Sequence, residues 1–193
     1  MNELGVIMIE IAAGAGLAAC AGLRAFLPLF ATGLAARAGW ITLGDRFEWL
    51  ASGPALVVFG AAVVVELLAD KIPIVDHALD LVQLAVKPVV GAFLCVAATH
   101  DLGPLPSAVL GLVVGGSSAG VVHVAKAKVR LLSTAFSAGI LNPFVSIAED
   151  LAAVAGVAMA IVAPLVALAF IASLAISFVI LVAAGRTLVS RPR

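Results

Sequence analysis

Apolar runs of about 20 residues or more, bounded by charges or proline, most constrain how this chain can fold. The runs cover 5–37, 51–69, 77–98, 105–138, 143–163 and 165–187. A helix needs about 20 apolar residues to cross the hydrocarbon core of a bilayer. Charged residues make up only 11% of the 193 residues, and the mean hydropathy is +1.25. Soluble domains carry about 25% charged residues, so the sequence predicts one all-α, polytopic membrane domain over residues 1–193.

The first and fourth runs are too long for one straight crossing. Each would form a helix of about 50 Å, against a hydrocarbon core of about 30 Å. The interruptions are Gly22, Arg24 and Pro28 in the first run, and Gly115, Gly116 and Gly120 in the fourth. Irregular backbone at membrane depth survives only where protein or water satisfies its polar groups. Each run must therefore break, tilt strongly or fold back. We expect both to be broken or re-entrant and to line an interior, and the sequence leaves both of these options open.

The same two runs also align with each other. Residues 5–36 and 111–142 match without a gap, and each copy carries one arginine in a glycine-rich apolar stretch. Apolar repeats interrupted at matching places predict a transporter-like site near the bilayer midplane. Alanine and glycine are common throughout the chain, which weakens the alignment. With three elements in each half, about 1–98 and 105–190, the second copy would be inverted, giving a three-plus-three inverted repeat.

The fourth run carries a basic helix face, which is the sharpest candidate for a ligand or ion-path site. At 3.6 residues per turn, the face carries His123, Lys126, Arg130, Thr134 and Ser137, with Ser133 beside it. Arg24 holds the matching position in the first copy. Cations and hydroxyl donors on one face are what an anionic ligand needs. The alternatives are internal salt bridges and lysines that extend to lipid headgroups.

Acidic residues surround the break expected at Pro73. They are Glu66, Asp70, Asp76 and Asp80, with Lys71 and His77 among them. Carboxylates gathered at one break in a membrane chain suggest a cation site or a proton relay. A solvated loop explains Asp76 and His77 equally well. Glu66, which stands inside an apolar run, needs another explanation.

The fifth run opens with Asn142, Pro143, Ser146, Glu149 and Asp150. We expect Asn142 to cap the helix and Pro143 to take its first position. Acids near a helix N-terminus suit its dipole, but two adjacent acids entering an apolar helix need partners. The sequence predicts that they pair with the cations of the basic face.

Three of these motifs together resemble the signatures of a bacterial integral-membrane family. They are GLRAFLPL at 22–29, DKIPxxD at 70–76 and NPxxSxxED at 142–150. The family is domain-of-unknown-function family 4126, and the likeness covers nearly the whole chain. The resemblance implies a membrane protein of this size and marks the motif positions as a site. It implies no chemistry.

The sequence does not indicate an enzyme. It has no glycine-rich phosphate loop, no nucleophile elbow, no HExxH and no Cys/His metal spacing, so we expect no catalytic residue, cofactor or metal. The 11 basic and 11 acidic residues balance, which argues against nucleic acid as a partner. The expected partners are the bilayer and an anionic small molecule or lipid, and a homo-oligomer stays open.

The leading functional hypothesis is a small membrane transporter or channel with a charged polar centre, handling an anionic or ion-coupled solute. The alternatives are a binding or carrier protein for an anionic lipid of the polyprenyl-phosphate kind, and a structural subunit of a membrane complex. A water-filled cavity at Arg130 would favour transport. A lateral opening beside Lys126 would favour lipid binding, and fully paired charges without a cavity would favour the structural role.

The orientation signal is weak. If 5–37 crosses once, the N-terminus shares a side with Lys71 and with the arginines at 186, 191 and 193. The positive-inside rule then predicts that both termini lie in the cytoplasm, and the resemblance to a bacterial family implies the bacterial inner membrane. Arg37 and Arg46 on the other side argue against this. Trp40 and Trp49 flank the 38–50 loop as interface anchors.

Overall fold

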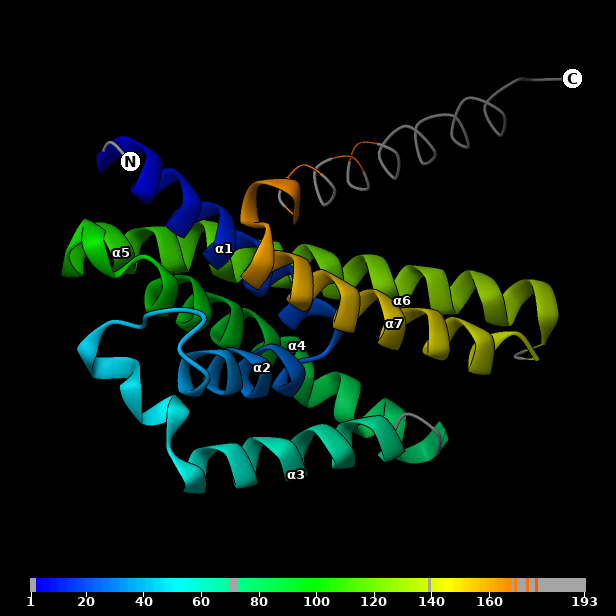
Figure 1. Cartoon of the computed structure of the whole chain (residues 1–193). Coiled ribbons are helices and arrows are strands. Elements are labelled where there is room, and N and C mark those ends of the chain that lie inside the picture. Colours follow the sequence, from blue (N-terminus) through cyan, green and yellow to red (C-terminus); the bar gives the residue numbers. More distant parts are fainter. Residues whose placement is uncertain are drawn as a thin grey trace, which may run out of the picture.

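The computed structural model describes residues 3–69, 73–138, 140–167, 169, 173 and 176, without the side chains of 73–78 and 80. This part of the chain is helical and contains no strand (Figure 1). The helices are α1 (Glu3–Leu23), α2 (Phe26–Arg37), α3 (Gly53–Ala69), α4 (Pro73–Ala98), α5 (Pro104–Leu110), α6 (Ser117–Ser137) and α7 (Asn142–Val162). Short 3-10 segments form at η1 (Asp45–Ala51) and η2 (His100–Leu102), and a π-helical segment, η3 (Gly111–Gly116), joins α5 to α6.

Within the described residues, four helical stretches are long and apolar enough to cross a membrane. They are α1, residues 81–98 of α4, the 34 residues 104–137, and α7. The pair of η1 and α3, bent by 64°, adds a fifth if it counts as one span. Large apolar side chains such as Leu112 and Phe136 point outward, where lipid would cover them. The chain is a helical membrane protein, as the sequence predicts.

The first run forms a helical hairpin. The chain turns at Arg24 and Ala25, and α2 leads back toward the end where α1 begins (Figure 1). Val6 and Glu10 of α1 consequently line one cavity together with Trp40 and Leu43, which follow α2. With 12 residues, α2 is about 18 Å long, too short to span the hydrocarbon core. The first run is therefore broken at Arg24, and α2 folds back toward the start of α1.

The hairpin divides the molecule into two ends. The loop end holds the start of α1, residues 38–52 and η2, and the turn end holds the last residues of α3, the start of α4 and the region between α6 and α7 (Figure 1). A single crossing by 5–37 would have put the end of α3 beside the N-terminus, and this expectation is wrong because α2 returns. Residues 177–193 lie outside the described residues, as does most of the sixth run, so a shared side for the two termini stays a prediction.

The fourth run remains one continuous helical stretch, contrary to the expected break. The glycine-rich residues 111–116 form the π-helical segment η3, and the stretch 104–137 stays helical on both sides of it. Arg24 therefore lies at a helix break, whereas its counterpart Arg130 lies inside α6. The two copies differ locally, and the inverted repeat is not confirmed.

Small residues allow α1, α4 and α6 to approach one another closely, as in many membrane bundles. A Cβ atom added to Gly91 of α4 would lie 2.6 Å from the Gly115 carbonyl oxygen. One added to Gly22 of α1 would lie 2.6 Å from Val122 Cβ. α1 is the central helix, because 56% of its apolar window is buried, against 28% in α7.

We predict that Gly115→Ala destabilises the protein whereas Gly120→Ala does not. An alanine Cβ at 115 would lie 2.5 Å from the Gly91 carbonyl oxygen and 2.7 Å from Cys95 Cβ, but at 120 its nearest neighbour is Pro88 Cγ at 3.7 Å. Overpacking of this kind typically costs about 1–3 kcal/mol. Melting temperatures of both variants in detergent would test the close packing, which equal values would contradict.

We also predict that residues 3 and 42 are accessible from the same side of the membrane. In a background with Cys20→Ala and Cys95→Ala, we would introduce Glu3→Cys, Thr42→Cys or Ile140→Cys singly, all at exposed positions. In sealed vesicles of known orientation, an impermeant maleimide should label the first two from one side and the third from the other. Labelling of the first two from opposite sides would rule out the hairpin.

Candidate functional site

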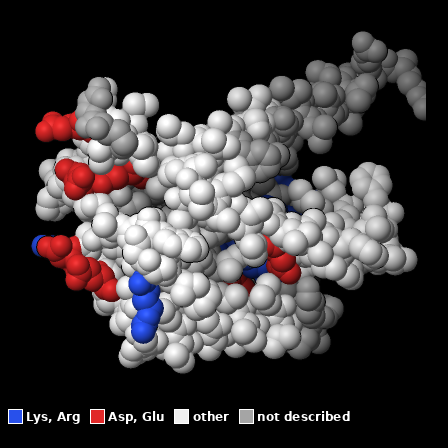
Figure 2. Space-filling model, viewed as in Figure 1, with Lys and Arg blue, Asp and Glu red and all other residues white. Residues whose placement is uncertain are grey.

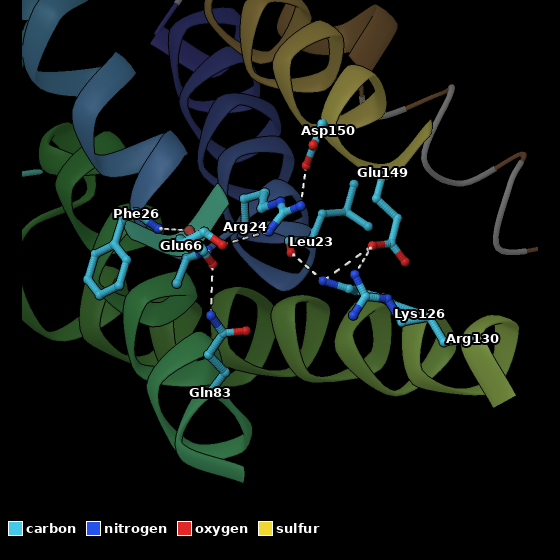
Figure 3. A network of polar contacts seen from close by, with 10 residues as sticks. Leu23, Arg24, Phe26, Glu66, Gln83, Lys126, Arg130, Glu149 and Asp150 are labelled. Carbon is cyan, nitrogen blue, oxygen red and sulfur yellow. Dashed lines mark hydrogen bonds and ion pairs between the residues drawn. The ribbon is translucent and has the colours of Figure 1, made fainter. Parts of the chain in front are cut away.

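Buried and partly buried polar side chains from α3, α4, α6 and α7 meet Arg24 at the break between α1 and α2 (Figure 3). We call this group the polar centre. It consists of Arg24, Glu66, Gln83, Lys87, His123, Lys126, Arg130, Glu149 and Asp150. On the face shown in Figure 2, charged atoms gather at the loop end and in a recess near the middle, and most of the remaining surface is uncharged.

Glu66 of α3 binds the N-terminal end of α2. Its Oε1 accepts hydrogen bonds from the Ala25 amide and from Gln83 Nε2, both at 2.9 Å, and its Oε2 accepts one from the Phe26 amide at 3.2 Å. The first amides of a helix have no partner within the helix and carry its positive dipole end. A buried carboxylate there satisfies two such amides and gains a favourable field.

Arg24 lies at the break itself and is only 1% exposed. Its Nη2 forms an ion pair with Asp150 Oδ1 of α7, and its Nη1 donates to the Glu66 main-chain carbonyl at 3.5 Å. The expected pairing of the arginines with acids is therefore confirmed. The guanidinium links the end of α1 to α3 and α7, which fixes the position of the break.

Lys126 and Arg130 converge on a single carboxylate oxygen. Lys126 Nζ lies 3.4 Å and Arg130 Nη2 lies 3.0 Å from Glu149 Oε2. Lys126 also donates to the carbonyl of Leu23, at the C-terminal end of α1, at 3.4 Å. The negative end of α1 therefore faces an ammonium, just as the positive end of α2 faces the Glu66 carboxylate (Figure 3).

The sequence analysis missed two members of the polar centre, Gln83 and Lys87. Both lie on α4 and are almost fully buried, and Lys87 Nζ lies 3.1 Å from His123 Nδ1. The ammonium has donors alone, so this nitrogen of His123 is the acceptor. Two polar residues four apart share one helix face, and that spacing inside an apolar run was the available signal.

The hydroxyl residues at the end of the basic face do not reach the polar centre. Thr134 and Ser137 donate back to the carbonyls of Arg130 and Ser133 within α6, a common alternative for such side chains. Arg130, one turn earlier, still reaches Glu149. The first three residues of the predicted basic face therefore lie in the polar centre, whereas its two hydroxyl residues lie at the turn end.

Asn142 has a different place from the predicted one. It is the first residue of α7, not its cap, and its amide donates to Thr134 Oγ1 at 3.0 Å. This bond ties α7 to α6 across the turn, so the cap prediction is wrong. Ser146 is buried on α7, one turn before Asp150.

Part of the predicted acidic group lies outside the described residues. Asp70 and Lys71 fall in the gap at 70–72, and the side chain of Asp76 is among those left out. The proposed cation site or proton relay at this break therefore stays a prediction. α4 does begin at Pro73, as expected for a proline that ends the preceding helix.

Comparison with known proteins identifies a family. Residues 11–184 match the family described as "Domain of unknown function (DUF4126)". The chain belongs to this family. No curated protein and no solved structure matches it. The family gives the polar centre no chemistry, so any function must be argued from the geometry.

We predict that Glu66→Gln destabilises the fold. The substitution removes the charge that faces the α2 amides, and hydrogen bonds to charged groups contribute about 1.5–3 kcal/mol. Each kcal/mol shifts the melting temperature of a chain this size by about 2–4 °C. Glu48→Gln is the control, because Glu48 is an exposed carboxylate in η1. Equal melting temperatures for the two variants in detergent would show that Glu66 does not hold the break.

Proposed function

We propose that this protein is a small membrane transporter or channel whose polar centre handles an anionic solute, alone or coupled to an ion. One observation carries the proposal. The buried Lys126 and the partly buried Arg130 converge on one oxygen of Glu149 directly beside a helix break. Discontinuous helices with charged side chains at the broken ends are the usual site architecture of secondary transporters.

The free-energy cost of burying charged side chains supports a functional role for the polar centre. Charged side chains inside a membrane protein are costly, and they usually mark pathways or proton relays. A bundle that needed only to be stable would gain more from apolar packing than from buried ion pairs. Glu66, Lys87, Lys126 and Glu149 are all nevertheless buried. Three helices supply Glu66, Lys126 and Glu149, and the break between α1 and α2 supplies Arg24.

Glu149 occupies the place that an anion would take. Its Oε2 receives both cations, whereas its buried Oε1 has no hydrogen-bond partner among the described residues. A solute carboxylate or phosphate would offer Lys126 and Arg130 more acceptors than this single oxygen does. We propose that the solute displaces Glu149, which acts as an internal anion in its absence.

Anionic-lipid binding is the second candidate, and a groove on α6 favours it. The groove has a volume of about 300 Å³ and is lined by Gly120, Val121, Val124, Ala125 and Lys128. An apolar groove that ends in an exposed ammonium fits an acyl chain with a phosphate headgroup. The expected lateral opening was beside Lys126, but Lys126 faces the polar centre and Lys128 faces outward.

The proposal includes a non-enzymatic role and a location in a bacterial inner membrane. Arg37 ends α2 and Arg46 lies in η1, both at the loop end, the end where α1 begins. With the hairpin, these arginines support a cytoplasmic N-terminal end instead of opposing it. Trp40 and Trp49 are exposed at the same end, as interface anchors are.

We predict opposite effects for two substitutions on solute uptake. Arg130→Lys keeps the charge but loses the planar fork, and uptake should fall about tenfold, the equivalent of about 1.4 kcal/mol of binding. Glu149→Gln removes the competing anion and should raise uptake at low solute concentration. The assay is uptake of chloride, inorganic phosphate and succinate into liposomes at matched folded amounts.

Arg46→Lys is the matched control, because Arg46 is exposed at the loop end. The same preparations would be tested for bound phosphatidylglycerol and polyprenyl phosphate. Lipid binding that depends on Lys128, without uptake, would select the lipid candidate. Folded protein that shows neither uptake nor lipid binding would leave the charges with a structural role alone and overturn the proposal.

A further inference from the structure

A second polar cluster lies at the loop end, about 20 Å from Arg24 along α1. It brings together Glu10 of α1 and the η2 residues His100 and Asp101, each with one potential metal-ligand atom within 4.8 Å of the others. His100 Nδ1 lies 3.5 Å from Glu10 Oε1, and His100 Nε2 lies 3.4 Å from Asp101 Oδ1. This cluster shares no residue with the polar centre.

The cluster opens on a cavity of about 610 Å³ whose wall also includes Thr32, Trp40 and Pro164. The side chain of Glu10 is nine-tenths buried, and its Oε2 has no hydrogen-bond partner among the described residues. The same holds for His100 Nδ1 and for Thr32 Oγ1 on the cavity wall. Buried polar atoms without partners are costly, so these atoms indicate something bound between them.

We propose that Glu10, His100 and Asp101 form a binding site for a divalent transition-metal ion, with Zn²⁺ as the best match. Imidazole and carboxylate together suit Zn²⁺, whereas Mg²⁺ and Ca²⁺ prefer oxygen ligands alone. In a tetrahedral site with bonds of about 2.1 Å, neighbouring ligand atoms lie about 3.4 Å apart. The separation of 3.5 Å between Glu10 Oε1 and His100 Nδ1 fits one edge of such a site.

Exposure and local charge suit a site that takes its ion from solution. Glu10 is buried, but the side chain of His100 is 28% exposed and that of Asp101 is 55% exposed. Acidic side chains also gather around this end of the molecule (Figure 2). With three protein ligands, the fourth position faces the cavity, where water or a small donor molecule would complete the coordination.

The test is direct metal binding by the full-length protein in detergent, purified without a histidine tag and stripped with EDTA. Zn²⁺ titrated by calorimetry should bind at one ion per chain, and Co²⁺ should give the visible absorption of a low-coordinate site. Glu10→Gln and His100→Asn should each weaken Zn²⁺ binding by at least about 10–100-fold, the usual loss for even an outer-shell partner. Glu48→Gln, the exposed acid in η1, should bind as the wild type does.

Several results decide the proposal. Wild-type protein that binds no Zn²⁺, or binds Mg²⁺ equally well, would overturn it. Zn²⁺ binding that survives both Glu10→Gln and His100→Asn would place the metal elsewhere and also overturn it. If Glu10→Gln does not fold, His100→Asn alone decides, because His100 is partly exposed on η2. Arg130→Lys should leave Zn²⁺ binding unchanged. A failure of the metal-site proposal can therefore be distinguished from a failure of the proposed solute transport.

Discussion

The polar centre depends on the bond between the Glu66 carboxylate and the first amides of α2. A helix that stops inside a membrane leaves amides and carbonyls without partners, and lipid cannot supply them. Here Glu66 accepts from Ala25 and Phe26, and Lys126 donates to the Leu23 carbonyl on the other side of the break. These two contacts allow α1 to end and α2 to begin within the bundle, and they bring α3 and α6 to the same point.

Once the break is fixed, the remaining charges follow in connected steps. Arg24, held at the break, reaches Asp150 of α7, and the neighbouring Glu149 receives Lys126 and Arg130. Gln83 supports Glu66 and lies one turn from Lys87, which contacts His123. His123 lies one turn from Lys126 on α6. Members of a polar network of this kind are energetically coupled, so a substitution of one partner should also change the stability of the helix break.

The sequence allowed the elements and the charged partners to be predicted, but not the path of the chain. Apolar runs located most helices, and the cost of buried charge predicted that Arg24 or Arg130 would meet one of four acids, Glu66, Asp70, Glu149 or Asp150. The hairpin formed by 5–37 depends on how α2 packs, which periodicity does not encode. The fourth run stays helical throughout, because Gly115 and Gly116 lie within the π-helical segment η3. Composition alone made the first and fourth runs look equivalent.

The cluster of Glu10, His100 and Asp101 at the loop end shows a second limit of prediction from sequence. Glu10 and His100 are 90 positions apart in the sequence, so no motif spacing could join them, and they meet only because α4 ends beside the first half of α1. Since α1 carries Glu10 near one end and leads to Arg24 at the other, a change of position in α1 would alter both sites together. α4 joins the two sites as well, because it carries Gln83 and Lys87 and ends just before His100. Any coupling between a metal ion at the loop end and a solute at the polar centre would therefore act through α1 and α4.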